Sequence, residues 1–142
     1  MAAIDVKRTP LEIMADLKRA HSVLSGRCFE NCVIAVLGLS RKARLQYILG
    51  FVTPPGYKAV SHAWLLDDSD QGPAYLDPTL QDGSQLWQSR SGEFIYDERY
   101  RLTKEELLAW FRSKYADRKF DEIGVPKGPV RGPIINAEGG LE

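Results

Sequence analysis

A thiol, an imidazole and a carboxylate follow one another along the chain, at Cys28, His62 and Asp77. A cysteine nucleophile needs an adjacent base, and the base is held in one tautomer by a third group, so these residue types suit thiol-dependent acyl transfer. Cys28 begins the apolar stretch 28–39, which is typical of a buried helix. The unpaired N–H groups and the positive dipole at a helix N-terminus favour a thiolate. The dipole contributes only ~0.3–1 kcal/mol, so we expect a neighbouring histidine to act as the base.

The sequence between His62 and Asp77 predicts a hairpin that brings the two residues together. A strand is expected over 60–66, a polar loop over 67–72 and a short strand over 74–77. In a hairpin that is symmetric about the loop, His62 opposes Asp77. Opposed residues of antiparallel strands have Cβ atoms ~4.5–5.5 Å apart, and a register slip of two still leaves a diagonal contact. We therefore expect the carboxylate to orient the imidazole.

Three further residues lie near this predicted site. The same symmetric register places Trp64 opposite Tyr75, on the face of the hairpin that carries His62. Core packing is the expected role of both aromatic residues, and a stacking wall for substrate is the alternative. Asn31, one turn after Cys28, either steadies the start of the helix or contacts substrate, and the sequence does not choose between these roles.

Three short strings carry a resemblance to a known family. RCFEN around Cys28, SHAWL around His62 and YLDPT around Asp77 resemble the motifs of small transglutaminase-like proteins of bacteria and their phages. Their order resembles that of transglutaminase-like and papain-like cysteine enzymes. The resemblance covers residues 27–79 and implies a papain-like (transglutaminase-like) fold with a cysteine nucleophile, a histidine base and an orienting aspartate. It does not fix the reaction, because this fold hosts proteases, amidases, deamidases and acyl transferases.

Other roles remain open for the same residue types. Cys32, one turn further along the apolar helix, is expected in the core, and it is the nucleophile only if the helix begins later. A zinc site would combine both cysteines with His62 and His21, but structural zinc sites usually take paired ligands from two knuckles, and these histidines are isolated. We predict no metal and no other cofactor. Asp77, which precedes Pro78, is alternatively only a turn former.

The elements that must position these residues indicate an α+β class. The predicted helices cover residues 10–20, 28–39 and 104–115, and the predicted strands cover residues 45–52, 60–66, 74–77 and 93–102. Consecutive strands joined by short loops pair antiparallel, so we expect N-terminal helices packed on an antiparallel sheet. Capping boxes are predicted at Thr9–Glu12 and at Thr103–Glu106. Residues 1–123 are expected to form one domain, and the Gly/Pro-rich residues 124–142 a tail.

Composition excludes several partners. Nineteen basic and nineteen acidic residues cancel, so there is no net positive field to collect nucleic acid or an anionic membrane surface. No apolar run reaches the ~18 residues of a membrane span. The first residues lack the layout of a signal peptide, and two cysteines four positions apart do not make a disulfide framework. We therefore expect a cytoplasmic protein with reduced thiols.

The functional hypothesis is a thiol-dependent acyl-transfer enzyme that acts on an amide bond of a peptide or protein. Cysteine protease or amidase is the leading subclass, followed by deamidase or transglutaminase with the same triad. The alternative from another class is a non-catalytic binding module that keeps the fold and holds a partner in its cleft. The sequence leaves the substrate, the second oxyanion donor and the oligomeric state open.

Overall fold

The computed structural model consists of short helices and strands and describes residues 5–20, 27–38, 44–68, 73–122, 124–128 and 131–142. In chain order the elements are β1 (Val6–Lys7), α1 (Leu11–Ala20), α2 (Cys28–Gly38), β2 (Leu45–Thr53), β3 (Val60–Asp67), β4 (Ala74–Leu76), α3 (Pro78–Gly83), α4 (Gln85–Arg90), the 3-10 helix η1 (Ser91–Glu93), β5 (Ile95–Leu102) and α5 (Lys104–Lys114). The class is α+β, as predicted, and the predicted helices and strands all occur, with no end shifted by more than two residues.

The strands form one sheet in the order β1-β4-β3-β2-β5. The pairs β3–β4, β2–β3 and β2–β5 are antiparallel, but β1 pairs in parallel with β4, through Val6 beside Tyr75. The sheet is therefore mixed, and the expectation of a purely antiparallel sheet is wrong at this edge. A two-residue strand has no detectable period, and the long connection from β1 to β4 allows either direction.

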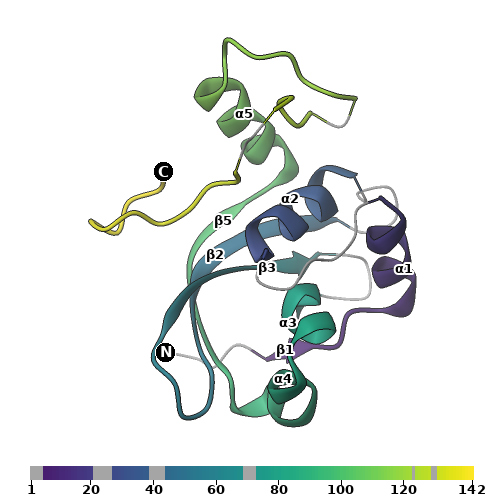
Figure 1. Cartoon of the computed structure of the whole chain (residues 1–142), viewed down its shortest axis with the longest axis vertical. Helices are drawn as coiled ribbons and strands as arrows, with labels where there is room; N and C mark the ends of the chain where they lie inside the picture. The colour runs from purple at the N-terminus through teal and green to yellow at the C-terminus, as the bar shows by residue number, and fades with distance from the viewer. Residues whose placement is uncertain (1–4, 21–26, 39–43, 69–72, 123, 129–130) are drawn as a thin grey trace.

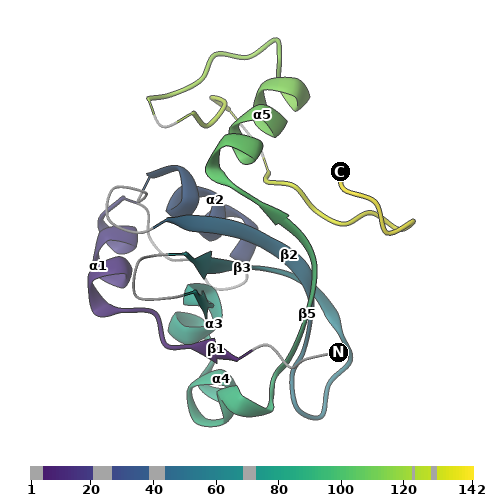
Figure 2. The same ribbon diagram turned by 180° about the vertical axis from the view of Figure 1, so that it is seen from behind.

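Helix α2 covers one face of the sheet because it is apolar on nearly every side (Figures 1 and 2). Its buried side chains pack against inward residues of β2 and β3, and α1 and α5 complete this core with Leu17, Leu107 and Phe111. The helix axis is thus fixed against the centre of the sheet. None of the described helices is long and apolar enough to cross a bilayer.

The opposite face carries a second, aromatic cluster. Its buried members are Ile48, Val52, Trp64, Leu66, Trp87, Phe94 and Tyr96. Gly50 makes this packing possible, since a Cβ there would meet the carbonyl oxygen of Asp97 and lie 2.9 Å from the Trp64 ring. The β2–β5 register also shifts at this glycine.

Two six-residue helices that the sequence did not predict, α3 and α4, connect β4 to β5. Each begins at a side-chain cap: Asp77 Oδ1 accepts from the Leu80 N–H at 3.2 Å, and Ser84 Oγ accepts from the Trp87 N–H at 3.1 Å. Helices of this length are too short to show a 3.6-residue period. The figures place α3 and α4 toward the end of the molecule opposite α5.

The capping predictions have different outcomes at the two helices. The Thr103–Glu106 box is confirmed, with both reciprocal hydrogen bonds present. The Thr9 prediction is wrong, because the Thr9 hydroxyl is buried without a hydrogen-bond partner while its N–H donates to Gln81 Oε1 at 2.6 Å. Packing against α3 therefore replaces the local cap at the start of α1.

The described part of the predicted tail lies against the domain. Tyr47 donates its hydroxyl proton to the Pro133 carbonyl at 2.9 Å, and Gly132 fits closely against Val33. Ile134 and Glu142 exchange backbone hydrogen bonds of 2.9 and 2.8 Å. The Gly/Pro density limits this segment to isolated bridges, as its composition indicated.

Candidate active site

The first turn of α2 presents Cys28 at the edge of the core. The first hydrogen bond of the helix runs from the Asn31 N–H to the Arg27 carbonyl at 3.0 Å, so the Cys28 N–H has no partner within the helix. The Cys28 side chain is 6% exposed and borders a pocket. The thiol and its own N–H are thus available at the end of α2 where the helix dipole is positive.

His62 and Asp77 meet through a register that differs from the expected one. Leu66 pairs with Tyr75, two residues away from the symmetric hairpin, and β4 ends at Leu76. A slip of two keeps every side chain on its own face, so His62 and Asp77 become diagonal neighbours. Their contact is retained: His62 Nε2 lies 2.7 Å from Asp77 Oδ2, and both side chains are buried.

His62 also interacts with Cys28, which completes the convergence of the three residues. Burial acts to lower the pKa of His62, but the charge of Asp77, its hydrogen bond, the hydrogen bond with Cys28 and the charge of that sulfur together raise the pKa to about 10. Since Nε2 contacts Asp77, Nδ1 is the ring nitrogen left for the sulfur. An imidazolium in this position stabilises a thiolate by charge.

A pocket of about 370 Å³ opens beside the sulfur. It is lined by Cys28, Phe29, Ser61, His62, Thr79, Leu80, Gly83 and Ser84. Apart from the imidazole and the thiol, the described lining offers only hydroxyl, backbone and apolar groups. The pocket can therefore hold an uncharged group next to the Cys28 thiol, with His62 beside it to accept or donate a proton.

The three weaker candidates from the sequence do not line this pocket. Asn31 is fully buried, and its Nδ2 donates to Thr79 Oγ1 at 2.9 Å, which joins α2 to α3. Trp64 is fully buried and packs against the His62 ring, with centroids 6.0 Å apart. The Tyr75 hydroxyl donates to Glu98 Oε1 at 2.7 Å. The geometry favours positioning and packing for the first two and a surface polar contact for Tyr75.

Two residues that the sequence did not predict extend the hydrogen bonding around Asp77. The Tyr96 hydroxyl donates to Asp77 Oδ2 at 2.7 Å, and Trp87 Nε1 donates to the Tyr96 oxygen at 2.9 Å. Tyr96 lies within a predicted strand, but its cross-sheet neighbour could not be inferred without the strand order. Trp87 lies on α4, which the sequence did not predict.

Cys32 lies one turn further along α2 and differs from Cys28 in its surroundings. It is fully buried, and burial, followed by the negative charges of Cys28 and Asp77, raises the pKa of this thiol well above its ordinary value. A thiol that stays protonated and has no access to solvent is a poor nucleophile.

We therefore expect Cys32→Ala to fold and to keep any thiol-dependent activity. The lost packing should lower the free energy of unfolding by ~1–2 kcal/mol. Urea unfolding and alkylation of the remaining thiol measure the two effects. Loss of thiol reactivity in Cys32→Ala, with reactivity kept in Cys28→Ala, would identify Cys32 as the nucleophile instead.

The raised pKa of His62 predicts a pH dependence of stability. In a Cys28→Ala background the Asp77 carboxylate and its hydrogen bond to His62 remain, and we expect them to keep the pKa of His62 above the ordinary value of 6.5. The folded state then keeps a proton that the unfolded state releases, so stability is complete below pH 6.5 and falls as pH rises toward the folded-state pKa. Between about pH 7 and 8.5 the slope should approach ~1.4 kcal/mol per pH unit.

Urea unfolding across this pH range measures the slope. The matched control is Cys28→Ala with His62→Gln, which removes the imidazole and leaves the other titrating groups in place. Equal slopes in the two proteins would contradict the raised pKa of His62.

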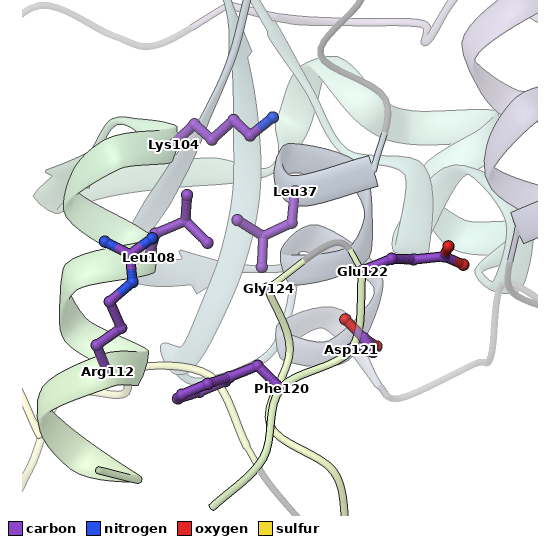
Figure 3. A pocket seen from close by; sticks show the side chains of 8 residues that line it. All are labelled: Leu37, Lys104, Leu108, Arg112, Phe120, Asp121, Glu122 and Gly124. Carbon is purple, nitrogen blue, oxygen red and sulfur yellow. The ribbon is translucent and has the colours of Figure 1, made fainter.

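A second pocket, of about 450 Å³, lies at the other end of α2, near Leu37 (Figure 3). It is bordered by Lys104 and Arg112 from α5 and by Asp121 and Glu122. A helix rises ~1.5 Å per residue, so this pocket lies more than a turn of α2 away from Cys28 and belongs to a separate surface.

Across the described ranges, no group of three or more His, Cys, Asp or Glu side chains is placed to hold a metal ion. His21, part of the zinc alternative, lies outside the described residues.

Comparison with known proteins gives no match to a family model, to a curated protein or to a solved structure.

Proposed function

We propose that this chain is a cysteine hydrolase or acyltransferase with a papain-like (transglutaminase-like) architecture, in which Cys28, His62 and Asp77 form the catalytic triad. The observation that carries the proposal is the position of His62, whose ring contacts a buried carboxylate on one side and a pocket-lining thiol on the other. Each ring nitrogen of a buried imidazole needs a hydrogen-bond partner, and here the second partner is a thiol at a helix N-terminus that also borders a pocket.

The geometry supports acyl transfer through a thioester. Cys28 Sγ attacks the substrate carbonyl carbon, and the C–S bond forms as negative charge develops on the oxygen. The Cys28 N–H at the start of α2 donates to that oxygen. The His62 imidazolium gives its Nδ1 proton to the leaving amine as the C–N bond breaks. Water or an amine then attacks the thioester, His62 accepts its proton, and the thiolate leaves.

The pocket supports an uncharged acyl group as the substrate class. Phe29 and Leu80 supply apolar walls, and the hydroxyls of Ser61, Thr79 and Ser84 supply neutral polar contacts. An ammonium group would lose part of its hydration there without gaining an ionic partner, because none of the described lining residues carries a carboxylate. An amide or peptide carbonyl with a neutral side chain is therefore the preferred substrate.

Alkylation kinetics test whether the thiol is activated. Iodoacetamide is added to the native protein, and peptide mass mapping follows Cys28 and Cys32 separately. We expect Cys28 to react at least about 10-fold faster than Cys32, and His62→Gln to slow Cys28 by a similar factor. Equal rates at the two cysteines, with no effect of His62→Gln, would support a binding module in place of an enzyme.

Acyl-enzyme formation tests the reaction itself. With p-nitrophenyl acetate we expect a burst of p-nitrophenolate that approaches one equivalent per chain, with the acetyl group on Cys28. Addition of a primary amine separates the subclasses, because an acyltransferase forms the acetamide while a hydrolase releases acetate. No burst and no acetylated cysteine would overturn the proposed function.

A further inference from the structure

A continuous run of buried hydrogen bonds extends from α4 to the proposed triad. Trp87 Nε1 lies 2.9 Å from the Tyr96 hydroxyl, and that hydroxyl lies 2.7 Å from Asp77 Oδ2. The same Oδ2 lies 2.7 Å from His62 Nε2. All four side chains are at most 6% exposed, so water does not compete for these bonds.

The chemistry of the donor and acceptor groups sets the direction of each hydrogen bond in this run. An indole N–H can only donate, so the Tyr96 oxygen must accept from Trp87. The single proton of the Tyr96 hydroxyl is then directed at Asp77 Oδ2. His62 Nε2 contacts the same oxygen, and the hydrogen of that bond lies on the nitrogen, because an imidazole nitrogen is much more basic than a carboxylate oxygen.

The other carboxylate oxygen of Asp77 is also committed, since Oδ1 caps α3 through the Leu80 N–H. Three donors at fixed positions prevent rotation of the carboxylate. The ring of Tyr96 also packs beside the ring of His62, with centroids 6.4 Å apart, and beside the ring of Trp64, with centroids 5.1 Å apart. This packing limits movement of the His62 ring.

We propose that Trp87 and Tyr96 are positioning residues, which hold the Asp77 carboxylate in place so that Nε2 of His62 faces Asp77 and Nδ1 faces Cys28. This inference rests on the proposed function. It adds two residues outside the triad on which the rate of Cys28 acylation depends. Neither side chain lines the pocket, so both act through Asp77 and not by contact with substrate.

The test removes one hydroxyl. Tyr96→Phe keeps the ring and deletes the donor to Asp77, while Tyr47→Phe is the matched control, since it deletes a buried hydroxyl that donates to Pro133. With p-nitrophenyl acetate we expect Tyr96→Phe to lower the acylation rate about 5- to 50-fold and to leave KM within about twofold. Tyr47→Phe should leave both unchanged. Trp87→Phe, which keeps an aromatic ring, should lower the rate about 2- to 5-fold.

A second readout does not depend on turnover. The ¹⁵N chemical shifts of the His62 ring, followed as the pH is raised, report which nitrogen keeps its proton when the imidazolium loses the other. We expect Nε2 to keep its proton in the wild type and in Tyr47→Phe, and the two neutral tautomers to exchange in Tyr96→Phe. If no variant acylates, the proposed function fails, yet the ring shifts still decide the role of Tyr96. Unchanged ring shifts in Tyr96→Phe, or an equal loss of rate in Tyr47→Phe, would overturn the inference.

Discussion

Cys28→Ala should abolish acyl-enzyme formation and lower turnover by at least about 10³-fold, because the attacking sulfur is removed and none of the other described residues that line the pocket carries a thiol. Cys28→Ser should be almost as inactive. The serine hydroxyl is a much weaker nucleophile than a thiolate and gains no charge from the adjacent imidazolium. The burst of p-nitrophenolate and mass mapping of the acyl group measure both effects.

The fold should survive either substitution. Cys28 occupies the edge of the core, so the loss of its sulfur should cost only ~1 kcal/mol of unfolding free energy. The matched control is Cys32→Ala, which removes a fully buried sulfur from the same helix and should keep its burst. Persistent turnover in Cys28→Ala with a native unfolding curve would refute the nucleophile assignment.

Asp77→Asn should lower turnover by about 10 to 10³-fold, which corresponds to ~1.4–4 kcal/mol of lost transition-state stabilisation. The amide still accepts a hydrogen bond, but it does not stabilise imidazolium by charge. We expect less than the ~10⁴-fold loss that the equivalent change causes in a serine protease, because a thiolate–imidazolium pair is already charged before attack.

The structure adds a folding cost to this substitution. Asp77 faces three donors, from Leu80, His62 and Tyr96, and an asparagine places its NH₂ against at least one of them. One unsatisfied buried donor costs ~1–3 kcal/mol, so the free energy of unfolding should fall by that amount. Asparagine remains a good N-cap, so α3 itself should persist.

Turnover and urea unfolding separate the two roles of Asp77. Asp82→Asn is the matched control, since its carboxylate makes a partly exposed ion pair with Lys18. It should change turnover little and stability by under ~1 kcal/mol. Reduced stability with unchanged turnover in Asp77→Asn would leave this residue as a helix cap and reduce the triad to a Cys28–His62 dyad.

Local sequence patterns were sufficient for the elements that carry the candidate triad. The apolar run after Cys28 specified a buried helix and placed the thiol in its first turn, because helix burial depends on residues a few positions apart. The strand around His62 and the Thr103 capping box also depend on residues that are close together in the sequence. The spacing from His62 to Asp77 indicated a contact, since a hairpin brings nearby residues together whatever its exact loop.

Only the tertiary structure decided how these elements combine. The β3–β4 register depends on loop geometry, so the symmetric hairpin was two residues away from the observed pairing. The parallel β1 edge depends on a partner nearly seventy residues away, through Val6 beside Tyr75. Tyr96 contacts Asp77, and Trp87 contacts Tyr96, because side chains of β5 and α4 pack together on one face of the sheet. Such contacts arise from packing between distant segments, which no local period encodes.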